Sequence, residues 1–228
     1  MYMALEILVD TANLETIRKY DRIINLAGVT TNPTILAKER GDFWGTLKEI
    51  RKIIGDRQLH VQLTATAYED MLKEADTITD RLGKGTYLKV PVNLTGLEVI
   101  KALKNKGYKV TGTAVYMPQQ AMLAGACGAD YVAPYFNRIS NNNVDAGESI
   151  AEMKQIFREH DVPTRILAAS FHNTQQIMDA LLAGAEAVTA SPEYYGMMVT
   201  NPLIDSAIAG FKKDWIGLYG DRMIYEMT

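Results

Sequence analysis

The stretch TYLKVPVNLTGLEVIKALKNKGYKVTGT, residues 86–113, decides the fold expected of this chain. Residues 86–92 form a short apolar run, typical of a buried strand. Residues 97–106 carry apolar side chains on one face at helical spacing. Gly107 can adopt the left-handed cap conformation, and residues 108–113 form a second strand-like run. Strand, helix, glycine and strand in this order indicate a βα unit.

The same unit recurs along the whole chain. Strand-like runs occur at residues 6–10, 27–31, 59–64, 86–92, 108–113, 130–134, 164–170 and 186–190. Helical spacing is clear at residues 67–82, 97–106, 148–159 and 174–183. Eight repeats predict an α/β fold with a single (β/α)8 TIM barrel over residues 1–228, since such barrels need roughly 200 to 250 residues. A doubly wound open sheet is the competing fold, but it would usually use fewer strands.

The segment after the last predicted strand forms an extra C-terminal helical tail. It ends in a series of apolar residues: Trp215, Ile216, Leu218, Tyr219, Met223, Ile224, Tyr225 and Met227. Such a tail is too apolar to be simply solvated. We expect it to pack on the outside of its own barrel or on a neighbouring subunit.

Composition narrows the classes of function. The chain has 228 residues and a formal net charge of -3, with 47% hydrophobic residues. This mild acidity argues against a nucleic-acid partner, and no run reaches the ~18 apolar residues of a membrane helix. Residues 1–6 lack the features of a secretory signal, so a cytoplasmic location is expected. The single cysteine, Cys127, excludes an internal disulfide framework, and the three histidines show no metal-ligand spacing.

Lys89 lies within the apolar run of residues 86–92. A charged ammonium group is rarely fully buried unless it is paired, and burial without a partner lowers the lysine pKa. A neutral amine is a nucleophile, so Lys89 is a candidate for Schiff-base chemistry on a carbonyl substrate. The alternative is a purely structural ion pair between Lys89 and Asp10.

Polar residues follow or end most of the predicted strands. In a TIM barrel the active site lies at the carboxyl ends of the strands, so these side chains should converge on one mouth. The candidates are Asp10, Thr30, Thr31, Asn32, Gln62, Thr64, Lys89, Thr111, Thr113, Tyr135, Asn137, Arg138 and Ser170.

Several of these residues also have structural interpretations. Asp10 could be the N-cap of a helix, because aspartate is a preferred cap residue. Asn32 and the following proline could form only a turn into the next helix. Gln62 could make a structural hydrogen bond, and Arg138 could pair with a surface carboxylate.

The chain resembles the small transaldolases and, within them, the fructose-6-phosphate aldolases. The matching segments are residues 8–11 (LVDT), 26–33 (LAGVTTNP), 88–92 (LKVPV), 112–116 (GTAVY), 131–138 (YVAPYFNR) and 166–171 (ILAASF). The resemblance implies a (β/α)8 barrel that uses Lys89 as its Schiff-base residue, with no metal or other cofactor. It also implies a sugar or sugar-phosphate substrate and a homo-oligomer, a ring assembly such as a decamer.

Two positions favour an aldolase over a transaldolase. Gln62 and Tyr135 stand where transaldolases usually carry glutamate and phenylalanine, and the fructose-6-phosphate aldolases look like this chain. An aldolase must protonate and hydrolyse the enamine of dihydroxyacetone that remains after cleavage. A phenol can relay a proton, whereas a phenyl ring cannot. A transaldolase that transfers dihydroxyacetone between sugar phosphates is the alternative, and a non-catalytic sugar-phosphate sensor is the third hypothesis.

The resemblance also assigns the remaining roles. Tyr135 would transfer protons with a water held by Gln62 and Thr113, and Asp10 would share the acid–base work. Substrate would be bound by Thr30, Asn32, Arg138, Ser170 and His172. His172 departs from the family, which often has lysine or arginine there to hold phosphate. Because histidine is mostly neutral above about pH 7, we expect weaker, pH-dependent selection of phosphate and tolerance of unphosphorylated aldehydes.

Overall fold

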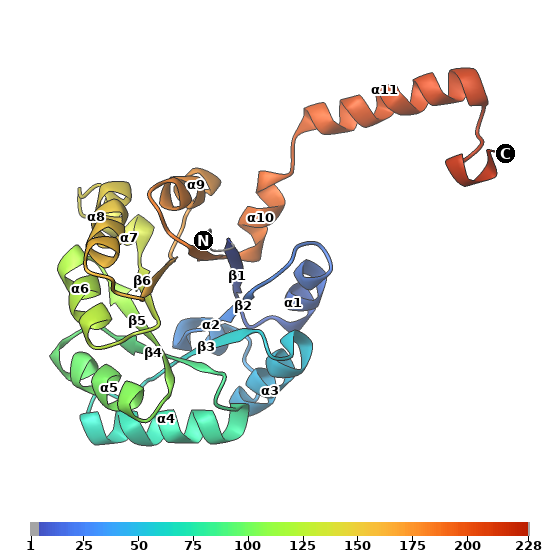
Figure 1. The fold of residues 1–228 in the computed structure, drawn as a ribbon. Helices are drawn as coiled ribbons and strands as arrows, with labels where there is room; N and C mark the ends of the chain where they lie inside the picture. The colour runs from blue at the N-terminus through green and yellow to red at the C-terminus, as the bar shows by residue number, and fades with distance from the viewer. Residues whose placement is uncertain (1–4, 228) are drawn as a thin grey trace.

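The computed structural model describes residues 5–227 as a closed barrel of parallel strands surrounded by helices (Figure 1). The strands are β1 (Glu6–Asp10), β2 (Gly28–Thr30), β3 (Gln58–Gln62), β4 (Tyr87–Pro91), β5 (Lys109–Val115), β6 (Tyr131–Pro134), β7 (Arg165–Ala168) and β8 (Ala187–Ala190). Each strand pairs with the next, and β1 pairs with β8 to close the barrel. The predicted TIM barrel is confirmed, and the open sheet is wrong.

Helices follow the strands in the order that the repeat predicts. They are α1 (Leu14–Asp21), α2 (Pro33–Lys38), α3 (Phe43–Ile54), α4 (Tyr68–Leu82), α5 (Leu94–Asn105), α6 (Pro118–Ala126), α7 (Phe136–Ser140), α8 (Ala146–Glu159), α9 (Thr174–Leu182), α10 (Pro192–Met198) and α11 (Pro202–Tyr219), with a final 3-10 helix η1 (Ile224–Glu226). Gly107, Gly128 and Gly184 all have positive φ after a helix, as expected. Within residues 5–227 no helix has the length and apolar character needed to cross a membrane.

Several element boundaries differ from the predicted ones by one to three residues, and two of these differences have clear local reasons. The helix expected at residues 97–106 begins at Leu94, because the Asn93 side chain accepts a hydrogen bond from the Gly96 N–H and caps it. The strand expected at residues 164–170 ends at Ala168, because Ser170 adopts a left-handed conformation with φ 61°. Residues 1–4, part of the segment expected to lack a secretory signal, lie outside the described residues.

The main core lies between the outer face of the barrel and the helices. Val9, Val61, Val90 and Val132 of four strands are fully buried there among apolar helix residues. A smaller cluster inside the barrel contains Leu8, Tyr131, Leu167 and Ala187. Successive side chains of a strand point to opposite faces, so one set of alternate residues builds the core and the other set fills the barrel.

The C-terminal tail does not pack on its own barrel. Helix α11 projects away from the barrel, and none of its residues is buried (Figure 1). Leu203 and Phe211 are 74% and 72% exposed. Trp215 contacts Tyr219, and its indole N–H donates to the Arg222 carbonyl, so the end of the tail folds back only on itself. Of the two positions expected for the tail, the first is wrong.

Candidate active site

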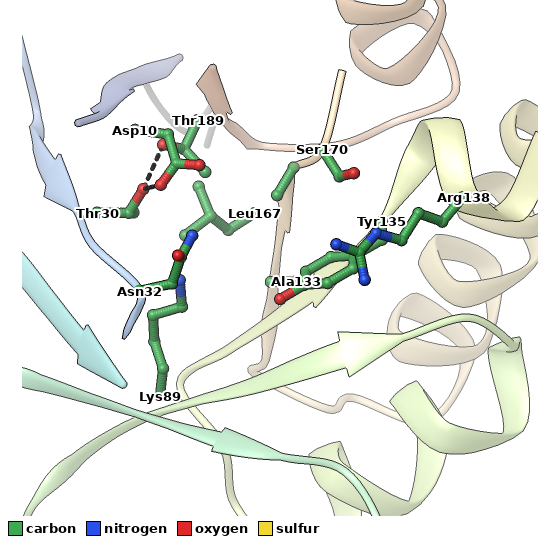
Figure 2. Close-up of a pocket in the computed structure, with 11 residues that line it drawn as sticks. Asp10, Thr30, Asn32, Lys89, Ala133, Tyr135, Arg138, Leu167, Ser170 and Thr189 are labelled. Carbon is green, nitrogen blue, oxygen red and sulfur yellow. Dashed lines mark hydrogen bonds between the residues drawn. The ribbon is translucent and has the colours of Figure 1, made fainter. Parts of the chain in front are cut away.

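A cavity of about 140 Å³ opens at the carboxyl ends of the strands. Seven of the predicted site residues line it: Asp10, Thr30, Asn32, Lys89, Tyr135, Arg138 and Ser170. Figure 2 shows these side chains converging from different strands and loops around one space. The parallel barrel explains this convergence, since it brings the same end of every strand to one rim.

Lys89 is a buried amine whose hydrogen-bond acceptor is a neutral backbone carbonyl. Its side chain points from β4 into the cavity and is only 6% exposed. The Nζ atom donates a 2.8 Å hydrogen bond to the Thr31 carbonyl, and no carboxylate of the described residues forms an ion pair with it at 4.0 Å or less. The structural ion pair with Asp10 is therefore wrong. Burial lowers the pKa of Lys89, and the more distant Asp10 charge only partly opposes this shift.

Asp10 ends β1 and is held by hydroxyl groups. The Thr30 Oγ donates to Asp10 Oδ1 at 2.6 Å and lies 2.7 Å from the Thr189 Oγ. Burial raises the pKa of Asp10, and the Lys89 charge and the Thr30 hydrogen bond oppose that rise. The N-cap of α1 is Asn13, so the interpretation of Asp10 as a helix cap is wrong. Its carboxyl group is free to face the cavity.

Asn32 both caps a helix and lines the cavity. Its Oδ1 accepts a hydrogen bond from the Ile35 N–H and caps α2, which begins with Pro33. Its side chain also lines the cavity and lies beside the end of Lys89 (Figure 2). Because the cap uses only the oxygen of the amide, the amide nitrogen can donate to a ligand.

Tyr135 forms a pair with Thr113. Their hydroxyl oxygens lie 3.0 Å apart. Burial raises the pKa of Tyr135, with the Thr113 hydrogen bond acting in the opposite direction. The phenol is therefore protonated near neutral pH and can donate a proton. Thr113 itself lies within an irregularity of β5 between Gly112 and Val115, where Ala114 has φ 55°.

Gln62 does not complete this group through a direct contact. It is the register partner of Lys89 on β3, but it lines two neighbouring cavities with Phe43 and Thr64. Thr113, although bonded to Tyr135, is fully buried behind the lining of the main cavity. The structure therefore brings Thr113 and Tyr135 together, and it leaves Gln62 at the end of β3, where it lines the neighbouring cavities.

The three predicted phosphate ligands are arranged unequally. The Arg138 guanidinium lies 5.0 Å from the centre of the Tyr135 ring and donates to the Tyr116 hydroxyl at 3.3 Å. Ser170 lines the cavity, and its carbonyl accepts a hydrogen bond from the N–H of Asn137. His172 is exposed and is not among the lining residues. Arg138 and Ser170 thus form the cavity wall, while His172 lies further out.

Four lining residues were not predicted: Ala133, Leu167, Ala169 and Thr189. The alternation of inward-facing and outward-facing residues along a strand could have identified them from the sequence. Leu167 and Ala169 alternate on β7 and beyond it, and Thr189 follows Ala187 by two residues on β8. Three of the four are apolar and offer no chemical signal. Thr189 is a polar residue near the end of a predicted strand, and the same argument that selected Thr30 would have found it.

Fold and site together define an enzyme of the barrel class, with a buried lysine, a tyrosine and a carboxyl group at the carboxyl ends of the strands. Residues 7–221 match the family described as Transaldolase/Fructose-6-phosphate aldolase. The chain is 41% identical to a probable fructose-6-phosphate aldolase of Streptococcus pneumoniae over 222 aligned residues. The aligned region covers 96% of this chain and 100% of that protein. The chain therefore belongs to the transaldolase/fructose-6-phosphate aldolase family, and it is an enzyme of the aldolase type.

Proposed function

We propose that this protein is a class I aldolase that interconverts fructose 6-phosphate with dihydroxyacetone and glyceraldehyde 3-phosphate, with residues 1–228 acting as one catalytic domain. The observation that carries the proposal is Lys89, a buried amine at the cavity with a lowered pKa and, within residues 5–227, no carboxylate in contact. The similar protein of Streptococcus pneumoniae bears the name of this activity.

The residues around the cavity support an imine mechanism. Neutral Lys89 attacks C2 of the ketose, and loss of water gives an iminium that acts as an electron sink. A base removes the C4 hydroxyl proton, and the C3–C4 bond breaks. Tyr135, paired with Thr113, then supplies the proton for the enamine through a water that Gln62 and Thr113 hold. Asp10 and Asn32 bind substrate hydroxyls, Thr30 holds Asp10, and Asp10 shares the acid–base work.

Aldehyde binding is the basis for the substrate tolerance that we propose. Arg138 and Ser170 line the wall of the cavity, whereas His172 lies outside its lining. One fixed cation in the wall supports binding of phosphate without making phosphate essential. We therefore expect activity with glyceraldehyde as well as with its 3-phosphate.

Trapping the imine tests the function. The protein is incubated with dihydroxyacetone and borohydride, and the modified peptide is identified by mass spectrometry. We expect a reduced adduct on Lys89 and on no other lysine. Absence of the adduct would contradict the proposal and would favour a sensor that binds sugar phosphates without reaction.

A second experiment separates the aldolase from the transaldolase, which the family also contains. Fructose 6-phosphate is incubated with and without an acceptor aldehyde such as erythrose 4-phosphate, and free dihydroxyacetone is measured. The phenol of Tyr135 can protonate the enamine, so we expect dihydroxyacetone to be released without an acceptor. Release only in the presence of the acceptor would identify a transaldolase.

We also propose that the enzyme is a homo-oligomer, a ring assembly such as a decamer, in which α11 packs on a neighbouring subunit. The support is the exposed apolar surface of this helix, which includes Leu203, Ile208 and Phe211. Trp215 is partly covered within the tail, so a substitution there would also disturb the tail itself. Phe211 is exposed, and Phe211→Glu therefore tests contact with a neighbouring subunit more directly. Light scattering should show a smaller particle for this variant, and an unchanged mass would contradict the role of α11.

A further inference from the structure

The Lys89 nitrogen is held by a residue that the proposed mechanism does not use. Its hydrogen-bond acceptor is the backbone carbonyl of Thr31, at 2.8 Å. Thr31 is fully buried, and it does not line the cavity. Its side chain therefore cannot act on substrate directly, and any effect on the reaction must pass through its backbone.

Two hydrogen bonds hold Thr31 against β3. Its N–H donates to the His60 carbonyl at 2.9 Å, and its hydroxyl donates to the same carbonyl at 3.0 Å. The segment after Thr31 is also constrained, because Asn32 is extended, with φ -150° and ψ 168°, before Pro33. Thr31 thus has a fixed position at the end of β2, and the direction of its carbonyl follows from that position.

His60 is itself a rigid anchor inside the barrel. Its Nδ1 lies 2.9 Å from the Thr111 hydroxyl, and its Nε2 lies 2.9 Å from the Gln58 side-chain oxygen. The ring stacks on Tyr87 with centres 4.5 Å apart and planes 8° from parallel. Burial holds the pKa of His60 well below its usual range, so the ring is neutral. A chain of fixed contacts therefore runs from the barrel interior to the Lys89 nitrogen.

We propose that Thr31 is a positioning residue for imine formation, because its two hydrogen bonds to the His60 carbonyl fix its own carbonyl where it accepts a hydrogen from the Lys89 nitrogen. A neutral amine has two hydrogens and one lone pair. With one hydrogen directed to Thr31, the lone pair is free to attack the ketose. This inference rests on the proposed function, since it assumes that Lys89 forms the imine.

The same contact can persist through the reaction. As the C–N bond forms, the amine gives one hydrogen to the ketose oxygen. A second proton, donated by Tyr135 and recovered when the C4 hydroxyl is deprotonated, lets that oxygen leave as water. The iminium nitrogen keeps one hydrogen and carries the positive charge, so its hydrogen bond to the Thr31 carbonyl becomes charge-assisted. An interaction that is stronger in the intermediate than in the free amine favours the reaction.

The hydrogen bond also has a consequence for pH dependence. A carbonyl acceptor stabilises the ammonium form of Lys89, so it holds the lysine pKa higher than burial alone would. A substitution that weakens the hydrogen bond between the Thr31 carbonyl and Lys89 should lower the lysine pKa. The pH at which imine formation sets in should then be lower. Among the described residues, Asp10 and His60 interact with the charge of the lysine, and Tyr135 and Arg138 line the same cavity. All of these are unchanged by a substitution at Thr31.

The test compares Thr31→Val with Thr31→Ser. Valine keeps the shape but removes the hydroxyl that binds the His60 carbonyl, and serine keeps the hydroxyl. Thr164→Val is the matched control, because the Thr164 hydroxyl is also buried and donates to a backbone carbonyl, that of Ala129, at 2.6 Å. Thr164 precedes β7, at the opposite end of the barrel from the cavity.

We expect kcat/KM for cleavage of fructose 6-phosphate to fall about tenfold in Thr31→Val, with the pH profile of borohydride trapping displaced to lower pH. Thr31→Ser should restore both, and Thr164→Val should lower the melting temperature without moving the profile. If Thr31→Val does not fold, Thr31→Ala makes the same comparison. Equal kinetics and pH profiles in wild type and Thr31→Val would overturn the inference, as would equal losses in the valine and serine variants. Failure of the wild type to form any adduct would instead overturn the proposed function.

Discussion

The charged side chains at the two ends of the barrel interior are arranged in opposite ways. At the amino ends of the strands, Arg165 donates to the Glu6 carboxylate, Tyr131 donates to its other oxygen at 2.6 Å, and Gln58 donates to the Tyr131 hydroxyl at 3.1 Å. Each of these four residues is the first of its strand: Glu6 of β1, Gln58 of β3, Tyr131 of β6 and Arg165 of β7. Here the charges neutralise each other.

At the carboxyl ends the charges are kept apart. Lys89 contacts a neutral carbonyl and Asp10 contacts a neutral hydroxyl. Burial therefore moves the pKa of the lysine down and that of the carboxyl group up. The comparison shows that paired charges serve the fold, while separated charges are brought toward the neutral forms that proton transfer and nucleophilic attack require.

Lys89→Met should have the largest effect. Without a nucleophile, cleavage of fructose 6-phosphate should fall to the uncatalysed rate. The fold should become more stable, because methionine has no charge to desolvate. Between the lowered pKa of Lys89 in the folded protein and its ordinary value of 10.5, only the unfolded state holds the proton, so wild-type stability rises with pH.

Thermal melts of both proteins across this pH range measure the difference. The stability advantage of Lys89→Met should be greatest below the folded-state pKa and should disappear as the pH approaches 10.5. If Lys89→Met were less stable than wild type at neutral pH, the charged form of Lys89 would be stabilised by its surroundings, as Glu6 and Arg165 are at the amino ends of the strands.

Tyr135→Phe should have the next largest effect. Removing a general acid typically costs roughly 10² to 10⁴-fold in rate, and the enamine that persists should be captured more often by an added aldehyde. Steady-state release of dihydroxyacetone, with and without acceptor, measures both changes. Tyr116→Phe is the matched control, since the Tyr116 ring lies 5.6 Å from that of Tyr135 and its hydroxyl accepts a hydrogen bond from Arg138. Equal losses in the two variants would remove the special role of Tyr135.

Arg165→Met tests the paired end of the barrel. It leaves Glu6 without its cation, and breaking a largely buried pair costs about 3 kcal/mol of unfolding free energy. The kcat of the folded protein should stay within about twofold of wild type, because the pair is at the far end from the cavity. Urea denaturation and steady-state kinetics measure the two quantities. The exposed Asp70–Lys73 pair supplies the control, and Lys73→Met should cost less than about 1 kcal/mol.

His172→Lys should have the smallest effect. An exposed cation near the mouth contributes little, so we expect the preference for glyceraldehyde 3-phosphate over glyceraldehyde to rise only about threefold. The ratio of kcat/KM for the two aldehydes measures this change, and an unchanged ratio in His172→Lys would contradict a role of position 172 in selecting phosphate.

Much of the site was predictable because strand ends in a closed barrel must meet. That rule located Asp10, Lys89 and Tyr135 from apolar patterns alone. It did not resolve distances within the rim. His172 lies outside the lining because the backbone turns sharply at Ser170, with φ 61°, and Gln62 lies to one side at the end of β3. Sequence patterns do not encode such turns.

The order of strands and helices, the barrel and the buried lysine follow from the sequence, because apolar periodicity and glycine caps depend on neighbouring residues. Tertiary structure alone decided that Lys89 contacts the Thr31 carbonyl and not Asp10, that Thr189 joins Thr30, and that α11 leaves the barrel. These outcomes depend on distances of a few ångströms between segments far apart in the chain, and only the packed barrel sets those distances.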